Sequence, residues 1–181
     1  GRNNLIDVIK KAAENVFIPI TVGGGIRSKE DAHKILRNGA DKVALNTAAV
    51  TNPNLINDLA KIFGSQCIVI SIEAKKISND KWEVFTQNGR NKTGLDVISW
   101  VKKVISLGAG EVLLTSIDKD GTKRGFDLDL IKRVSKICKV PLIVSGGLGN
   151  FEHLDKLLKI GSVDGISAAK ALFLSFVLQS V

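Results

Sequence analysis

The sequence predicts an α/β fold, a (βα)8 barrel whose first two strands are missing from the chain. Three observations predict it: short apolar runs alternate with amphipathic helices, a glycine-rich turn follows more than one of these runs, and one strand–loop–helix–strand unit occurs twice. A barrel of this kind takes about 250 residues and eight strands. This chain of 181 residues shows six strands in the alternating pattern. We therefore expect a single domain over 1–181, a fragment without the first two βα units.

The first part of the chain alternates regularly between helices and strands. Apolar residues over 5–13 recur with helical spacing, and an apolar strand over 18–22 follows. Ser28 is placed to cap the next helix and Gly39 to end it. The elements expected here are a helix over 29–38, a strand over 42–47, a helix over 54–63 that Pro53 opens and Gly64 ends, and a strand over 67–72.

The alternation breaks at 82–94, where two β-like runs flank an Asn88-Gly89 turn and predict a hairpin inserted in a loop. Trp82 and Phe85 in this hairpin could form a lid over a ligand or pack the hairpin on the rim of the fold. The alternation then resumes with a helix over 96–107, a strand over 111–117, a helix over 128–137, a strand over 141–144, a helix over 151–160 and a strand over 165–169. A doubly wound open sheet also fits six strands, but the internal repeat favours the barrel.

The repeated unit matches 18–26 to 140–148 at an offset of 122 residues, and the match continues without a gap for about 33 residues. Gly24-Gly25 thereby matches Gly146-Gly147. Each glycine pair follows an apolar strand, where backbone without Cβ can approach a ligand and direct its N–H groups at an anion. One pair alone is explained as well by a tight turn. Two equivalent pairs predict a ligand with a phosphate at each end, held across a pseudo-twofold axis.

The composition limits the function classes. The net charge of +8 suits an anionic ligand, but the lysines are scattered without a basic stripe or aromatic ladder, which disfavours nucleic acid. The longest apolar run, at 171–178, is far shorter than the roughly 20 residues of a membrane span. Cys67 and Cys138 lack metal-ligand spacing and are predicted to be reduced thiols of a cytoplasmic protein. His33 and His153 have no spaced metal partner, so we predict surface helix residues and no metal or cofactor.

Four segments carry a resemblance to a known family. They are 22–27, 40–48, 63–66 and, most specifically, Thr115-Ser116-Ile117-Asp118-Lys119-Asp120-Gly121-Thr122. These segments resemble the cyclase subunit of imidazole glycerol phosphate synthase, from histidine biosynthesis, and the resemblance covers essentially the whole chain. It implies a heterodimer with a glutaminase that supplies ammonia. The cyclase converts a bis-phosphorylated formimino-aminoimidazole-carboxamide ribonucleotide into imidazole glycerol phosphate and aminoimidazole carboxamide ribonucleotide, a lyase reaction on a substrate with two phosphates.

The resemblance also implies which residues bind those phosphates. One phosphate would lie on Gly25, Asn46 and Thr47. The other would lie on Asp120, Gly121, Gly146, Gly147, Ala169 and Lys170. Lys170 departs from the small residue usual in the family, so either its charge enters the site or only its backbone N–H serves.

The implied chemistry is general acid–base catalysis by two carboxylates, on the first and fifth strands of the barrel. Glu73 stands where the family carries the second, an aspartate. Its extra methylene moves the carboxylate by over 1 Å, a displacement that can cost about 100-fold in a positioned reaction. The alternative for Glu73 is a solvated side chain at a strand end. The first-strand aspartate is absent from these 181 residues, so we expect them to turn over substrate poorly alone.

A partner-facing set is implied at the opposite end of the barrel: Asp41, Lys42, Gln66 and Glu111. Lys42 and Glu111 would form the charged gate through which ammonia enters, and strand parity allows both to point inward at the strand bases. Asp41 would contact the partner, although a salt bridge within the subunit is an ordinary alternative.

Two other functions stay open at this point. One is a paralogous subunit that supplies ammonia for amidation of a bacterial surface sugar, which Glu73 and the run 92–96 bring into consideration. The other is a catalytically silent protein that binds a glutaminase and activates it. Ammonia-dependent turnover of the histidine-pathway ribonucleotide separates the cyclase from both.

Overall fold

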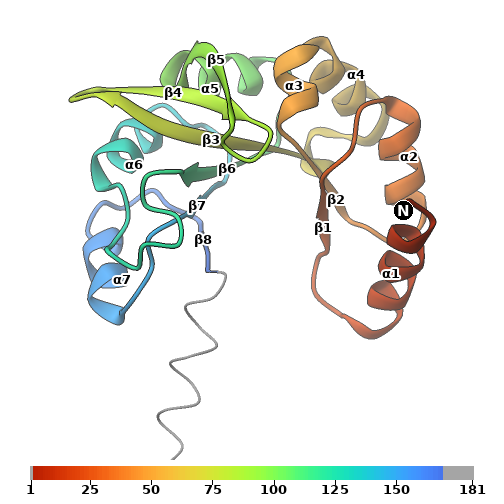
Figure 1. The fold of residues 1–181 in the computed structure, drawn as a ribbon. Helices are drawn as coiled ribbons and strands as arrows, with labels where there is room; N and C mark the ends of the chain where they lie inside the picture. The colour runs from red at the N-terminus through yellow and green to blue at the C-terminus, as the bar shows by residue number, and fades with distance from the viewer. Residues whose placement is uncertain (1, 169–181) are drawn as a thin grey trace, which may run out of the picture. The chain divides into compact units, whose positions relative to one another are not determined.

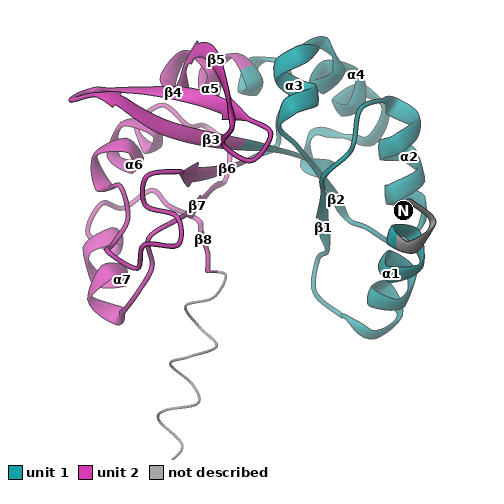
Figure 2. Cartoon of the chain, in the orientation of Figure 1, with its two compact units in different colours: residues 1–71, 104–111 teal, residues 72–103, 112–181 magenta. Residues whose placement is uncertain are grey.

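Figure 1 shows the computed structural model of the chain, which describes residues 2–168. The chain folds into two compact units, coloured separately in Figure 2. Unit 1 comprises Gly1–Ser71 and Val104–Glu111, and unit 2 comprises Ile72–Lys103 and Val112–Val181. Three elements contribute residues to both units: strand β3 (Ile68–Ser78), helix α5 (Val97–Ser106) and strand β6 (Glu111–Ser116).

Unit 1 begins with a helix and continues as alternating strands and helices. Its elements are α1 (Arg2–Asn15), β1 (Thr21–Gly23), α2 (Lys29–Arg37), β2 (Lys42–Leu45), α3 (Thr47–Thr51), α4 (Asn54–Phe63), a 3-10 turn at Ser65–Cys67 and the start of β3. The three strands pair in parallel in the order β1-β2-β3. Parallel pairing of consecutive strands across helical connections is the pattern predicted for a (βα)8 barrel.

Unit 2 continues the parallel pattern and adds an antiparallel hairpin. Its further elements are β4 (Lys81–Thr86), β5 (Asn91–Asp96), α6 (Leu128–Ser135), β7 (Leu142–Ser145), α7 (Phe151–Leu158) and β8 (Gly165–Ser167). The end of β3 lies beside β6, and β6, β7 and β8 pair in parallel. Strands β4 and β5 pair antiparallel, β4 against β3, outside this series.

Apolar side chains of the strands and helices fill the interior of each unit. In unit 1, Val43 and Leu45 of β2 are buried with Leu59 of α4. In unit 2, Leu114 of β6 and Val144 of β7 are buried in the same way. Fully burying a Val, Leu or Ile side chain stabilises a fold by about 1.5–3 kcal/mol. These cores fix the strands, and the loops after the strands carry the candidate phosphate-binding residues.

The helix signals read from the sequence are confirmed. The Ser28 hydroxyl accepts a hydrogen bond from the Asp31 N–H at 3.2 Å and caps α2. Gly39 follows this helix with a φ of 109°. Helix α4 spans Asn54–Phe63 as predicted, because Pro53 caps its start and Gly64 its end.

Two predicted strands are shorter than expected. The strand over 18–22 begins only at Thr21, because Pro19 has no N–H and the Ile20 N–H donates to the Asp41 side chain instead of to a strand carbonyl. The strand over 42–47 ends at Leu45, since Asn46 turns the chain (φ −126°, ψ −86°) and opens the unpredicted helix α3.

The predicted hairpin is confirmed as β4 and β5, but a third strand also belongs to the insertion. Strand β3 runs on to Ser78 and pairs with β4, so three antiparallel strands are present. The extension was missed because its exposed lysines lie beyond the apolar run that marked the strand. Trp82 and Phe85 are 1% and 3% exposed, which confirms packing of the hairpin and rules out a lid made of these rings.

Candidate functional site

The first glycine loop follows β1 in unit 1. Gly24 and Gly25 have φ angles of 96° and 70°, a region that glycine enters without steric cost, and a Cβ built on either meets nothing within 4 Å. A cavity of about 140 Å³ opens against both glycines, and Lys34 of α2 contributes a cation to its lining. The Asp31 carboxylate lines the same cavity, so the backbone of this loop is accessible to a ligand with one cation and one carboxylate nearby.

Asn46 and Thr47 lie at the carboxyl end of β2, the strand next to β1. The register Gly23↔Ala44 places the start of the glycine loop beside the carboxyl end of β2. The side-chain oxygen of Asn46 is buried without a hydrogen-bond partner among the described residues. Gly25, Asn46 and Thr47 thus come from the same end of two adjacent parallel strands, as the sequence predicted.

The second glycine loop follows β7 in unit 2. Gly146 and Gly147 have φ angles of 96° and 101°. The loop after β6 packs directly on it, since the Gly125 N–H donates to the Gly147 carbonyl at 2.8 Å. A Cβ on Gly147 would stand 2.1 Å from the Gly125 carbonyl oxygen, so no other residue fits there. The two loops are joined by this direct backbone hydrogen bond.

Asp120 and Gly121 lie in the loop after β6 and differ in what they can offer a ligand. The Asp120 N–H is already bonded to the Ser116 carbonyl at 2.9 Å. Gly121 has a φ of 70° and open space around its Cα. The Gly121 backbone is thus the more available of the two. The predicted residues Ala169 and Lys170 lie outside the described residues.

Glu73 projects from β3 and is half-buried. Its carboxylate Oε2 accepts a hydrogen bond from the Gly89 N–H at 2.8 Å, in the turn of the β4–β5 hairpin. A Cβ on Gly89 would lie 3.3 Å from Ile117, so the turn is packed against the loop after β6. Glu73 is therefore a held carboxylate and not a freely solvated one.

At the amino ends of the strands, Lys42 and Glu111 form an ion pair within unit 1. Each is the first residue of its strand, β2 and β6. The side chains of Lys42 and Glu111 are 30% and 10% exposed, so water screens this pair less than a surface one. The family resemblance assigned these two charges to one gate, and the structure brings them into contact.

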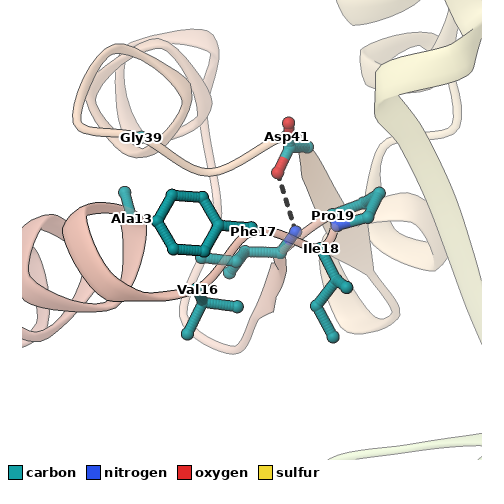
Figure 3. A pocket seen from close by; sticks show the side chains of 8 residues that line it. Ala13, Val16, Phe17, Ile18, Pro19, Gly39 and Asp41 are labelled. Atoms are coloured by element: carbon teal, nitrogen blue, oxygen red, sulfur yellow. Dashed lines mark hydrogen bonds between the residues drawn. The ribbon is translucent and has the colours of Figure 1, made fainter.

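Asp41 and Gln66 lie near this pair in the chain and are both exposed. The Asp41 Oδ2 accepts the Ile20 N–H at 2.7 Å, a bond drawn in Figure 3. Asp41 also lines a pocket of about 330 Å³ beside the start of β1. Gln66 folds back over Gly64 and reaches the Phe63 carbonyl at 3.4 Å. Asp41 therefore has a structural role within unit 1 besides any contact with a partner.

Apolar side chains surround Asp41 in this pocket. Val16, Phe17 and Ile18 line it, as Figure 3 shows, and Phe17 and Ile18 are 95% and 72% exposed. An exposed apolar surface rimmed by charges is typical of a protein–protein contact. The strand-base end of unit 1 thus combines a carboxylate with accessible apolar area.

Sequence reasoning missed several residues that the structure brings into contact. Trp82 Nε1 donates to the Asp127 carboxylate at 2.8 Å, and the same carboxylate caps α6 through the Leu130 N–H. His153 was expected at the helix surface but is half-buried, with Nδ1 accepting the Gly149 N–H at 3.1 Å. The alignment of His153 with Asp31 in the repeated unit was the one sequence signal that could have pointed to the His153–Gly149 contact.

In the described residues, the candidates for metal ligands are the His, Cys, Asp and Glu side chains, and those for a disulfide are Cys67 and Cys138. Within residues 2–168, His, Cys, Asp and Glu nowhere gather in threes as they would around a metal ion. Cys67 and Cys138 are free and half-buried. In the described part of the chain, no helix has both the length and the apolar character that crossing a membrane demands.

Comparison with known proteins adds to this geometry. The profile of the family described as histidine biosynthesis protein matches residues 1–176. The imidazole glycerol phosphate synthase subunit HisF of Legionella pneumophila is 60% identical over 155 residues, 86% of this chain and 73% of that protein. The HisF subunits of Streptococcus mutans serotype c and Bacillus cereus strain Q1 are 51% and 53% identical over 169 residues, in each case 93% of this chain and 67% of the relative.

Proposed function

The chain belongs to the histidine biosynthesis protein family, as a cyclase (HisF) subunit of imidazole glycerol phosphate synthase with a partial (βα)8-barrel fold, and from this we propose how its residues serve the reaction. The substrate is a bis-phosphorylated formimino-aminoimidazole-carboxamide ribonucleotide. Ammonia supplies one nitrogen of the new imidazole ring, the substrate is cleaved and one water is lost, which gives imidazole glycerol phosphate and aminoimidazole carboxamide ribonucleotide. This makes the subunit a lyase.

One observation carries the proposal: a glycine pair with positive φ follows both β1 and β7, and exposed glycine backbone is present at each place, Gly24-Gly25 at the first and Gly121, beside the buried Gly146-Gly147 pair, at the second. Gly25, Asn46 and Thr47 would bind one phosphate, and Lys34 adds a positive charge beside it. Gly121, Gly146 and Gly147 would bind the other, with Asp120, Ala169 and Lys170 completing that end. Backbone N–H groups in such loops suit phosphate because they donate hydrogen bonds without bringing side-chain bulk.

Glu73 is the proposed acid–base residue of this chain. The Gly89 N–H supports this role, because a donor bonded to one carboxylate oxygen fixes the side-chain rotamer and leaves the other oxygen for a proton transfer. A second carboxylate, on a strand that is not part of these 181 residues, would share the work. Turnover by the 181 residues alone is therefore expected to be slow.

A glutaminase is the proposed partner in a cytoplasmic heterodimer. The partly buried ion pair Lys42–Glu111 would gate the passage of ammonia at the strand bases. The exposed Phe17, Ile18 and Asp41 offer the apolar and charged contacts of a docking surface beside it.

A catalytically silent activator of a glutaminase is the second candidate. It is favoured by the Glu73–Gly89 contact, which would also be expected of a carboxylate that only anchors the hairpin. The test supplies the ribonucleotide and ammonium to the chain with its glutaminase, and compares Glu73→Gln with the unchanged protein. The cyclase predicts turnover that Glu73→Gln lowers by about 10²-fold or more. Glutaminase activation without ribonucleotide turnover would instead establish the silent partner, and turnover unaffected by Glu73→Gln would remove Glu73 from the mechanism.

A further inference from the structure

His153 and Asp31 occupy the same position in the two copies of the repeated unit. They lie 122 residues apart, in the first turns of α7 and α2. The Asp31 carboxylate accepts the Arg27 N–H at 2.9 Å, and His153 Nδ1 accepts the Gly149 N–H at 3.1 Å. Arg27 and Gly149 are also equivalent at this offset. An imidazole nitrogen in one copy thus does what a carboxylate oxygen does in the other.

The reciprocal hydrogen bond of each cap is repeated as well. Ser28 Oγ accepts the Asp31 N–H at 3.2 Å, and Asn150 Oδ1 accepts the His153 N–H at 3.1 Å. Each glycine loop is therefore joined to its helix by a two-way capping arrangement, in which both the cap residue and the residue three positions later supply an acceptor. The loop backbone just after the glycines is fixed by this arrangement.

His153 makes one contact that connects it to the second glycine pair. A Cβ built on Gly125 would lie 3.3 Å from His153 Cδ2, so the edge of the ring rests against the Gly125 backbone. Gly125 in turn donates its N–H to the Gly147 carbonyl at 2.8 Å. The imidazole thus supports the glycine loop from two sides, through Gly149 directly and through Gly125.

We propose that His153 is a positioning residue for the second phosphate, one that shapes the Gly146-Gly147 loop without touching the ligand. An imidazole nitrogen that accepts a hydrogen bond brings no negative charge with it. A neutral acceptor orders the loop without placing a negative charge beside a phosphate, which a carboxylate in the same position would do. This inference rests on the proposed function, since it assumes that the second loop binds phosphate.

The test follows the backbone amide signals of the full 181-residue chain by NMR during titration with inorganic phosphate at pH 8. The Gly147 and Gly121 amides report the second loop, and the Gly25 amide reports the first loop in the same sample. We expect His153→Phe to weaken phosphate binding at Gly147 by about three- to tenfold, the effect of losing one ordering hydrogen bond. Binding at Gly25 should stay unchanged. The matched change Asp31→Leu should weaken phosphate binding at Gly25 and leave binding at Gly147 unchanged.

Two conservative variants keep the test decisive if His153→Phe fails to fold. In His153→Asn the side-chain oxygen can stand where Nδ1 stood, so affinity at Gly147 should be retained. In His153→Gln the oxygen lies one methylene further out, and affinity should fall. Equal affinity at Gly147 in the Asn and Gln variants, or in His153→Phe and the unchanged chain, overturns the role of His153. Absence of any phosphate response at both loops of the unchanged chain overturns the proposed function, and this inference with it.

Discussion

Asp41 and Asp164 make the same pair of hydrogen bonds at the bases of two different strands. Asp41 accepts the Ile20 N–H at 2.7 Å, and Asp164 accepts the Leu142 N–H at 2.9 Å. The backbone N–H of each aspartate returns a bond to the carbonyl of that same residue, at 2.9 Å in both cases. Each aspartate therefore holds the residue just before β1 or at the start of β7, and fixes the point at which the strand begins.

Removing the Asp164 side chain should destabilise the fold modestly. Asp164→Ala leaves the Leu142 N–H without its acceptor, and one such hydrogen bond contributes about 1 kcal/mol. Urea unfolding monitored by circular dichroism measures the change. Asp155→Ala, which alters an exposed aspartate of the neighbouring helix α7, is the matched control and should shift the unfolding free energy by less than about 0.5 kcal/mol. Equal shifts for both variants would show that the Leu142 bond contributes nothing.

Asp41 should affect partner binding through its charge and folding through its hydrogen bond. Asp41→Asn keeps an oxygen for the Ile20 N–H, so the free energy of unfolding should change little. Asp41→Lys should weaken the measured complex with the glutaminase by about 1 kcal/mol or more if that contact is desolvated. Calorimetric titration of both variants separates the two roles. An unchanged affinity for Asp41→Lys would place the docking surface elsewhere or leave Asp41 at its rim.

Shortening Glu73 should release the hairpin turn. In Glu73→Asp the carboxylate retracts by one methylene and can no longer reach the Gly89 N–H, which it now accepts at 2.8 Å. The Gly89 amide should then exchange with solvent deuterium about tenfold faster or more, because about 1.4 kcal/mol corresponds to a factor of ten. Hydrogen exchange read by NMR gives the rate, with the Thr93 amide, held by Glu83 in the same hairpin, as the internal reference. Unchanged Gly89 protection would contradict the anchoring role.

Trp82→Phe should destabilise unit 2 through one lost polar contact. The phenyl ring fills most of the space but donates nothing to Asp127, whose buried oxygen then lacks a partner. A buried acceptor left unpaired costs about 1–3 kcal/mol. Thermal unfolding by calorimetry measures the lost stability. The single variant Asp127→Asn, which keeps Trp82, tests whether a neutral acceptor suffices for the Trp82 N–H. A melting temperature unchanged in Trp82→Phe would mean that the ring alone holds the hairpin.

Cys138 should be slow to react with alkylating reagents. Burial raises the pKa of the Cys138 thiol, and a raised pKa means that less of the reactive thiolate is present at neutral pH. The alkylation rate of Cys138 should therefore increase with pH. It should still be increasing at pH values where the rate of an ordinary free cysteine has already reached its plateau. Mass spectrometry of iodoacetamide adducts at several pH values follows each cysteine separately. A rate at Cys138 that levels off where glutathione does would disprove the shift.

The sequence predicted the elements whose signals are local. Pro53 and Gly64 bracket α4, and Ser28 caps α2, because both devices act within a few residues. The true start of β1 was not predictable in this way, since it depends on a bond between Ile20 and Asp41, residues from two different strand bases. Contacts between residues distant in the chain are the ones that patterns of spacing do not contain.

The candidate site divides in the same manner. Both glycine pairs and the Lys42–Glu111 contact were predicted, whereas the bond from Glu73 to Gly89 and the role of His153 were not. The gap-free alignment of the repeat is also wrong beyond its helix. The registers Thr21↔Lys42 and Ile143↔Gly165 require an offset that grows from 122 to 123 residues, and only then does Asp164 match Asp41.

The paired caps have a consequence for how such a protein can evolve. Ser28 and Asn150, like Asp31 and His153, differ in chemistry while they hold the same backbone N–H groups. If the two copies of the repeated unit arose by duplication, the position of the acceptor atom must be kept in both. The identity of the residue that supplies this atom can change. Each half is therefore free to change the charge beside its own loop without loss of geometry. Divergence of this kind lets a duplicated scaffold adapt its two ends to unlike parts of an asymmetric metabolite.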